Sequence, residues 1–495
     1  MIPPGQAETV ALLRRLAGGV APVETHISLV FLGEHTVWKL RKAVRLPFLD
    51  FSTLAERQRT ALREFDLNAP HAPGLYRDVA PVVRTAHGGL AVGGDGEVVD
   101  WVVRMARVPA DDFLDVMAAR GPLDPALLDA LGDAVAAYLA AAPVAGLDGL
   151  AAQRWLTDGD VRSARAAGLP EADIVVWEAA MRRQLARRAA WLRARGEAGF
   201  VRRCHGDLHL GNICLWRGAP VPFDAVEFDE AIATGDVAYD LAFLLMDLEH
   251  KAGRAAANRV LNRYVARTGD HALVAGLPLF MAQKAMIRAH VEAARGRGDE
   301  ARAYLAMSLG YLHPPPPLVV AIGGLQGTGK STLARLLGPA LGAAPGALVL
   351  RSDEFRKRRH GVAPETPLPE QAYGNAANRA VAADLFAAVA EVAGSGHAAI
   401  ADAMFLHPQH RAGVERAAGA ARFVGIWLEA PLAVLEARIA GRRHDASDAT
   451  VAVLHRSLRA KPGAVGWHRV DATDLDRAHA EMLAIVRAAD TGGAC

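Results

Sequence analysis

The sequence predicts two domains of different fold class within its 495 residues. The first, residues 1–311, is an α+β domain of two lobes, with strands over about 20–107 and helices over about 108–311. The second, residues 318–495, is an α/β domain with a mainly parallel sheet, because apolar strand patterns alternate there with helical ones. A proline-rich linker at 312–317 separates the two, since consecutive prolines cannot continue a helix or a central strand.

A β-hairpin and a helix in the first lobe carry a candidate phosphate-binding pair. Residues 26–32 and 36–40 alternate with the period of a strand and are separated by turn residues. Lys39 lies late in the second strand, and Glu64 lies on the helical segment that follows. Kinase-like lobes use such a pair to hold the α- and β-phosphates of ATP. A solvated strand end is the alternative for Lys39 and for the nearby Lys42, and no G-x-G-x-x-G precedes either lysine.

The stretch around which the first domain is organised is His205–Asn212, which reads H-x-D-L-x-x-x-N. In this spacing the aspartate, here Asp207, accepts or orients the proton of an attacking hydroxyl, and the asparagine, Asn212, holds magnesium on the ATP phosphates. Asp224 ends a short apolar run farther on, where a second metal ligand is expected. The alternative is a surface loop that contains these residue types by coincidence.

These positions resemble the aminoglycoside phosphotransferase family over about residues 20–310. The match rests on His205–Asn212, Asp224 and Asp240–Ala242. It implies a two-lobed kinase-like fold in which Asp207 is the catalytic base and Lys39 binds phosphate. It also implies that Asn212 and Asp224 are the magnesium ligands, and that Asp240 bonds the loop backbone.

The same resemblance implies phosphorylation of hydroxyl groups on small molecules, among them aminoglycosides, choline, sugars and homoserine. Antibiotic-binding members present an acidic surface to cationic drugs. Candidate acidic residues here are Asp229 and Glu230, without a dense cluster around them. Antibiotic resistance is therefore a minority interpretation.

A phosphate-binding loop opens the second domain. Residues 318–322 have the pattern of a buried strand and lead into Gly324–Ser331, which reads G-x-x-x-x-G-K-[ST] before a helix. Glycines let the backbone N–H groups curl around phosphates, and the helix N-terminus adds partial positive charge. Lys330 is expected to reach the β- and γ-phosphates and Ser331 to bind magnesium. The predicted nucleotide-binding residues are Gly324, Gly327, Gly329, Lys330, Ser331 and Thr332.

Two later strand patterns lead into carboxylates, Asp353 and Asp402. The carboxyl ends of parallel strands lie on the edge of the sheet that holds the phosphate-binding loop, where ligands bind. We expect Asp353 to orient an acceptor hydroxyl and Asp402 to bind magnesium, directly or through water. The alternative is that each only caps the helix after it. Farther on, Ser447 and Asp448 are expected to cap a helix over 449–458.

Arg438 and Arg442 lie four residues apart, on one face of a predicted helix and its exit. Paired arginines here resemble the lid of small P-loop kinases, where they neutralise the transferring phosphoryl group. A solvated helix face is the alternative. With the strand-end acids, the segment through Arg443 makes residues 318–490 similar to the zeta-toxin, gluconate-kinase and shikimate-kinase group. Both halves together resemble bacterial proteins described as bifunctional aminoglycoside phosphotransferase and ATP-binding protein.

Composition narrows the classes of partner and the cellular locations that the sequence allows. A net charge of +2 gives no indication of a nucleic-acid partner. Three cysteines cannot build a disulfide framework, and no run of about 18 apolar residues is present to span a bilayer. No basic start precedes an apolar stretch, so we expect a cytoplasmic protein without a membrane partner.

The leading hypothesis is an ATP- and Mg²⁺-dependent phosphotransferase with two nucleotide sites, each acting on a hydroxyl of a small molecule such as a sugar or amino sugar. In the alternative, one domain is a nucleotide-sensing regulator of the other and performs no chemistry. A purely scaffolding role is hard to reconcile with an intact phosphate-binding loop. Neither the acceptor nor the oligomeric state is indicated by the sequence.

Overall fold

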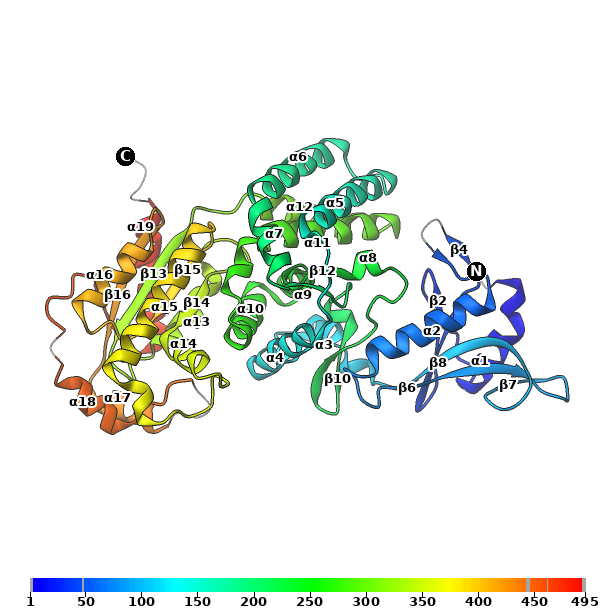
Figure 1. The fold of residues 1–495 in the computed structure, drawn as a ribbon, viewed down its shortest axis with the longest axis horizontal. Coiled ribbons are helices and arrows are strands. Elements are labelled where there is room, and N and C mark those ends of the chain that lie inside the picture. The colour runs from blue at the N-terminus through cyan, green and yellow to red at the C-terminus, as the bar shows by residue number, and fades with distance from the viewer. Residues whose placement is uncertain (1–2, 47–48, 442–445, 461, 492–495) are drawn as a thin grey trace. The chain divides into compact units, whose positions relative to one another are not determined.

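The structure, a computed structural model, describes residues 3–46, 49–441, 446–460 and 462–491. The chain forms two compact units (Figure 1). Unit 1 comprises residues 1–123, 137–152 and 193–244, and unit 2 comprises 124–136, 153–192 and 245–495.

Unit 1 contains a six-stranded antiparallel sheet in the order β1-β2-β3-β8-β6-β7. Its strands are β1 (Val23–Glu24), β2 (Ser28–Leu32), β3 (Thr36–Arg41), β6 (Tyr76–Arg84), β7 (Leu90–Val92) and β8 (Glu97–Ala106). The predicted hairpin is confirmed as β2 and β3, with Lys39 opposite Val30.

The two faces of β3 explain where its charged residues point. Leu40 packs into a core with helix α1 (Ala7–Leu16), whereas Val37 packs into the core formed with helix α2 (Leu54–Asn68). Because side chains alternate along a strand, Lys39 and Arg41 share the face of Val37 and point toward α2.

Two short antiparallel strand pairs place the loop His205–Asn212 of unit 1, the candidate catalytic loop. Strand β9 (Val201–Arg203) pairs with β12 (Thr234–Asp236), and β10 (Ile213–Trp216) pairs with β11 (Ala219–Pro222). The loop between β9 and β10 contains the 3₁₀ turn η3 (Leu210–Asn212), and Asp224 follows β11. The loop and Asp224 are therefore held at neighbouring ends of paired strands.

Helices predominate over residues 108–311, which also contain the strands β9 to β12. The remaining elements before the linker are η1 (Pro4–Gln6), β4 (Arg45–Leu46), β5 (Leu49–Asp50), η2 (Ala110–Asp112), α3 (Leu114–Arg120), α4 (Pro125–Ala141), α5 (Gly149–Ala166), α6 (Glu171–Arg187), α7 (Ala189–Glu197), α8 (Glu230–Ala233), α9 (Val237–Ala252), α10 (Arg254–Thr268), η4 (His271–Ala275), α11 (Leu277–Ala294) and α12 (Gly298–Tyr311). Among the described residues, none of these or the later helices has the length and apolar character of a membrane span.

Unit 2 contains a five-stranded parallel sheet in the order β14-β15-β13-β16-β17, which confirms the predicted α/β class. Its strands are β13 (Leu318–Gly324), β14 (Leu348–Arg351), β15 (Ala399–Asp402), β16 (Arg422–Glu429) and β17 (His468–Asp471). Its helices are α13 (Lys330–Leu337), η5 (Gly338–Ala340), α14 (Ser352–Arg359), η6 (Glu370–Tyr373), α15 (Asn375–Gly394), α16 (Pro408–Ala417), α17 (Leu432–Ala440), α18 (Val451–Leu458) and α19 (Leu475–Thr491).

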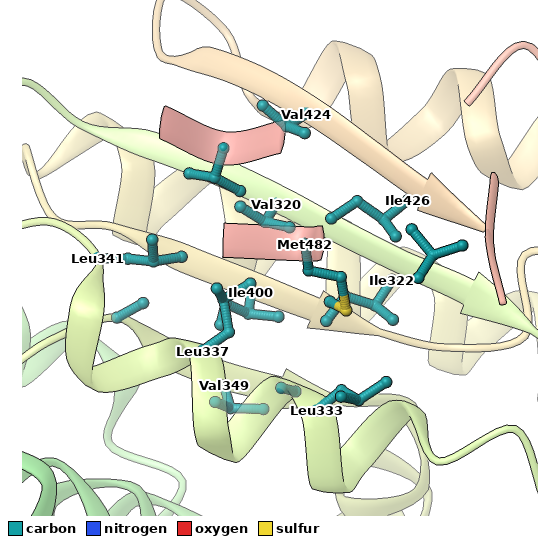
Figure 2. Packing of buried hydrophobic residues seen from close by; sticks show 14 of the residues in the cluster. Val320, Ile322, Leu333, Leu337, Leu341, Val349, Ile400, Val424, Ile426 and Met482 are labelled. Carbon is teal, nitrogen blue, oxygen red and sulfur yellow. The ribbon is translucent and has the colours of Figure 1, made fainter. Parts of the chain in front are cut away.

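The core of this sheet fixes the start of α13. Leu333 and Leu337 pack against Ile322 and Ile400 of the central strands, and Met482 of α19 joins the same cluster (Figure 2). These side chains are almost completely buried. Burying each large aliphatic side chain stabilises the folded state by about 2 kcal/mol, which anchors the helix directly after the phosphate-binding loop.

Helix α10 covers the open edge of the sheet at β14, and Figure 1 shows the two side by side. The Asn258 amide donates to the carbonyl of Ala347 at 3.0 Å, and the backbone N–H of Val349 donates to Asn262 Oδ1 at 2.7 Å. Side chains of a helix thus take up backbone groups that a further strand would otherwise pair.

Candidate active sites

The predicted lysine–glutamate pair is present in unit 1. Lys39 Nζ donates to Glu64 Oε1 at 2.8 Å, and it also contacts Asp224 Oδ1. Glu64 is completely buried on α2. Burial opposes the charged ammonium, but the carboxylates of Asp224 and Glu64 outweigh it and raise the pKa of Lys39. Lys39 is therefore a permanent cation in the site, whereas Lys42 bonds Glu24 Oε1 at 2.8 Å.

Arg41 and Glu227 are site residues that sequence reasoning missed. Arg41 Nη2 donates to Glu64 Oε2 at 2.5 Å and pairs with Glu227, while its Nη1 donates to Ser28 Oγ at 2.7 Å. The strand period alone could have placed Arg41 on the face of Lys39. Its link to Glu227 spans most of the domain and leaves no local signal.

The candidate catalytic loop is held by Asp240, as expected. One carboxylate oxygen of Asp240 accepts the backbone N–H of His205 at 2.9 Å, and the other accepts that of Gly206 at 3.0 Å. Within the loop, Asn212 Nδ2 donates to Asp207 Oδ2 at 3.0 Å and to the Asp207 carbonyl at 2.9 Å. Asp207 is thus oriented by a neighbour five residues away.

His209, a third residue that sequence reasoning missed, also faces Asp207. The backbone N–H of Gly211 donates to His209 Nδ1 at 3.1 Å, so the neutral ring carries its proton on Nε2. That nitrogen lies 3.5 Å from Asp207 Oδ2. A Cβ at position 211 would lie 3.0 Å from His209 Cε1, so the ring would have to shift by a few tenths of an ångström to admit an alanine.

His205 links the loop to the segment that carries Asp224. Its Nδ1 accepts the backbone N–H of Asp207 at 3.3 Å, so the proton on Nε2 is donated to the Phe223 carbonyl at 2.8 Å. Burial lowers the pKa of His205. Asp224 itself has a left-handed backbone with φ of 62°, and its N–H donates to Tyr76 Oη at 3.2 Å.

The arrangement around Asp224 suits magnesium. Burial opposes the ionised form of Asp224, but the attraction of Lys39 is stronger and lowers the pKa of Asp224. The charge of Asp207 is near enough to have the opposite effect on that pKa. The described residues contain no cluster of three His, Cys, Asp or Glu side chains positioned for a metal. If Asn212 and Asp224 are the ligands, as the sequence predicts, they would hold magnesium together with phosphate oxygens and water, as this ion prefers.

The phosphate-binding loop of unit 2 has the backbone that its glycines permit. Gly327 has φ of 85°, and a Cβ there would lie 2.6 Å from the Leu435 carbonyl oxygen. Gly324 and Gly329 also have positive φ. Lys330 begins α13 and donates to the carbonyls of Gly324 at 3.0 Å and Leu325 at 2.8 Å, so its side chain lies over the loop.

Both strand-end acids lie at the predicted edge of the sheet. Ser331 Oγ donates to Asp402 Oδ2, an alcohol and carboxylate pair that suits a magnesium ion. Arg351 Nε lies 3.5 Å from the same carboxylate. Asp353 is the second residue of α14, and burial together with Asp402 raises its pKa. A carboxyl with a raised pKa is a suitable proton acceptor for an alcohol.

One cavity of about 1200 Å³ unites these residues. Its lining includes Gly327, Gly329, Lys330, Ser331, Thr332, Asp353, Asp402 and Arg438, together with Arg356, Tyr373 and Asn378. This volume accommodates a nucleotide together with a small acceptor.

Of the arginines that resemble a lid, only Arg438 lies within the described residues. Arg438 donates to the carbonyls of Ala472 at 2.8 Å and Thr473 at 2.9 Å, at the margin of the cavity. Arg442 and Arg443 lie outside the described residues.

The expected cap of the following helix was wrong. Thr450 is the N-cap of α18, whereas Asp448 accepts the backbone N–H of Leu368 at 3.0 Å and pairs with Lys357 and Tyr373. These contacts fasten a loop beside the cavity, a role that local spacing could not reveal.

Two family models match separate parts of the chain. Residues 30–277, half of the chain, match the Phosphotransferase enzyme family, and residues 319–461 match the AAA domain family. An uncharacterized protein of Mycobacterium tuberculosis is 30% identical over 477 residues, covering 90% of this chain and 91% of that protein.

Two solved structures resemble parts of the chain. An aminoglycoside 2′-phosphotransferase-IIIa in its GDP complex has 14% identity and a TM-score of 0.35, covering 61% of this chain and 97% of that chain. A gluconokinase from Sinorhizobium meliloti has 20% identity and a TM-score of 0.26, covering 35% of this chain and 94% of that chain. The family matches confirm the expected pairing of two kinds of domain in one chain.

Proposed function

This chain belongs to the phosphotransferase enzyme family, and we propose that it is an ATP-dependent kinase with two nucleotide sites that phosphorylates hydroxyl groups of small molecules. One observation carries the proposal. Each unit brings a lysine, oxygen-bearing side chains and a further carboxylate together, which are the groups that phosphates, magnesium and an acceptor hydroxyl would require. Phosphoryl transfer needs little more from a protein than positioning and neutralisation of charge.

In unit 1, Lys39 neutralises the α- and β-phosphates, and Asn212 and Asp224 hold magnesium. An ion held there would neutralise charge that develops on the phosphates during transfer. Asp207 takes the proton of the acceptor hydroxyl. Hydrogen bonding from Asn212 at 3.0 Å and the facing N–H of His209 orient its carboxylate before the acceptor arrives.

In unit 2, Lys330 binds the β- and γ-phosphates, and Ser331 and Asp402 hold magnesium. Asp353 accepts the proton of the acceptor, which its raised pKa supports. Arg438 completes the nucleotide side of the cavity, in contact with the loop after β17.

The acceptor of unit 1 is proposed to be a sugar or another neutral molecule rather than a cationic antibiotic. Glu230 Oε1 accepts from Arg63 at 2.9 Å, and Arg203 contacts the same carboxylate. Asp229 accepts backbone N–H groups at the start of α8. Both acidic residues already have partners, so neither offers an unpaired carboxylate to an ammonium group.

Nucleotide stoichiometry tests the two sites separately. The full-length protein is expected to bind two Mg·ATP per chain in calorimetric titration. Lys39→Met and Lys330→Ala should each bind one, and the double variant none. Lys42→Met is the matched control, because Lys42 is also a buried lysine of this lobe but bonds Glu24 and the Thr25 carbonyl instead of facing the site.

Turnover then separates catalysis from sensing. Asp207→Asn should retain both binding events but lose the ATP consumption of unit 1 with a panel of sugars and amino sugars. Asp353→Asn should do the same for unit 2. Two binding events with turnover at one site would support the regulator alternative, and a wild-type chain that binds no Mg·ATP would refute the proposal.

A further inference from the structure

Five charged side chains form a cluster in unit 1, which we call the buried charge cluster: Lys39, Arg41, Glu64, Asp224 and Glu227. Both cations and the two glutamates are at least nine-tenths buried. Two cations face three carboxylates, so the cluster carries one excess negative charge. Buried charges without compensation are costly, and the partner of each carboxylate therefore decides what Lys39 can do.

In the structure Lys39 is shared. Its ammonium contacts Asp224 on one side and Glu64 Oε1 on the other, at 2.8 Å. Asp224 would hold magnesium, and an ion there would replace the Lys39 ammonium as the partner of this carboxylate. Lys39 can then turn to the phosphates only if the remaining carboxylates of the cluster do not capture it.

Arg41 occupies those remaining carboxylates. Its Nη2 donates to the other oxygen of Glu64, Oε2, at 2.5 Å and pairs with Glu227. Its Nη1 is fixed by Ser28 Oγ at 2.7 Å. Burial and the nearby Glu64 raise the pKa of Glu227, whereas Arg41 opposes this effect. The ionised form of Glu227 is therefore costly here, and the positive charge of Arg41 reduces that cost.

We propose that Arg41 is a positioning residue for phosphotransfer in unit 1: it neutralises Glu64 and Glu227, and so releases Lys39 to the nucleotide phosphates once magnesium takes Asp224. This inference rests on the proposed function of unit 1. It assigns a role to a guanidinium that does not itself touch the nucleotide. A lysine could not replace it fully, because one guanidinium reaches Glu64, Glu227 and Ser28 at once.

The test uses the full chain with Lys330→Ala, so that only unit 1 binds nucleotide, and measures the affinity for ATP at several magnesium concentrations. Arg41→Gln should weaken Mg·ATP binding by about tenfold or more, as expected when a charged hydrogen bond is lost. Arg41→Lys should recover part of the loss. The control is Arg57→Gln, which breaks another buried ion pair of the same lobe, at 2.8 Å to Asp100, outside the cluster.

One double variant separates positioning from stability. Glu227→Gln added to Arg41→Gln should restore most of the affinity, because the competing carboxylate loses its charge. A purely structural role for Arg41 predicts additive losses instead.

Several outcomes overturn the inference. They are wild-type affinity in a folded Arg41→Gln variant, an equal loss in Arg57→Gln, or no recovery on adding Glu227→Gln. Thermal unfolding of each variant establishes that it is folded. Failure of the proposed function has a different signature, since the Lys330→Ala parent would then bind no Mg·ATP at any magnesium concentration.

Discussion

Substituting Asp240 by asparagine should loosen the catalytic loop of unit 1 by a predictable amount. The carboxylate is buried and accepts two backbone N–H groups, from His205 at 2.9 Å and Gly206 at 3.0 Å. An amide has only one acceptor oxygen, so one N–H must face an NH₂ group. The loss of one charged bond and the weakening of the other should cost about 2 to 4 kcal/mol.

Amide hydrogen exchange measures this cost locally, because a chain with two compact units does not unfold in one step. Exchange at His205 and Gly206 should become about 30-fold to several hundred-fold faster in Asp240→Asn. Turnover at unit 1 should fall as well, since Asp207 directly follows these residues. Nucleotide binding to unit 2 should be unchanged.

Asp229→Asn provides the matched control. Asp229 also accepts two backbone N–H groups, from Ala231 and Ile232, but at an exposed helix N-terminus where asparagine is an equally good cap. Its cost should be a few tenths of a kcal/mol. Unchanged exchange at Gly206 in Asp240→Asn would refute the reasoning, because the N–H would then have found another partner.

Three further outcomes are expected. Gly211→Ala should push the His209 ring from its place, because the new Cβ would lie 3.1 Å from Nδ1, and should lower turnover at unit 1 about tenfold. Burial lowers the pKa of His397 to about 4, so the unfolded chain binds the proton first as the pH falls from 6.5. The free energy of unfolding of unit 2 should therefore fall by about 3 kcal/mol between pH 6.5 and pH 4. In His397→Gln, which retains an N–H for the Gly346 carbonyl, it should fall by less over the same range. Removal of magnesium with EDTA should abolish ATP consumption at both sites.

Each of these outcomes has a control. Gly310→Ala adds a methyl group where nothing lies within 4 Å, so it should leave turnover intact; an unmoved His209 ring signal in Gly211→Ala would contradict the packing argument. His468→Gln removes an exposed histidine of unit 2 and should retain the wild-type pH response. Equal losses in His397→Gln and the wild type would exclude His397 as the cause. ATP consumption that survives EDTA would rule out the magnesium assignment.

The sequence was informative wherever chemistry depends on spacing within one loop. His205–Asn212 places a carboxylate and an amide five residues apart, and their 3.0 Å contact requires only the local turn. Gly324–Ser331 needs only glycine torsions and the helix start that follows. The parallel sheet could be predicted for a similar reason, because its central strands are continuous apolar runs.

Contacts between distant segments were not predictable. Arg41 and Glu227 meet through the folding of the whole of unit 1, and neither belongs to a motif. Strand β17 escaped notice because, of His468–Asp471, only Val470 is buried, so no apolar alternation marks it. Thr450 rather than Asp448 caps α18 because Asp448 is engaged by the buried ammonium of Lys357, which lies 91 residues earlier.

Asn258 and Asn262 of α10 determine where a stable C-terminal fragment of this protein can begin. The prolines before β13 look like a natural breakpoint, yet a fragment that begins there would lack α10 and leave β14 with unpaired backbone groups. Exposed strand edges recruit strands from other molecules. Such a fragment should precipitate or form aggregates, whereas one that begins upstream of Arg254 keeps its own cover. A soluble nucleotide-binding fragment of unit 2 must therefore include α10, which lies in the region matched by the Phosphotransferase enzyme family.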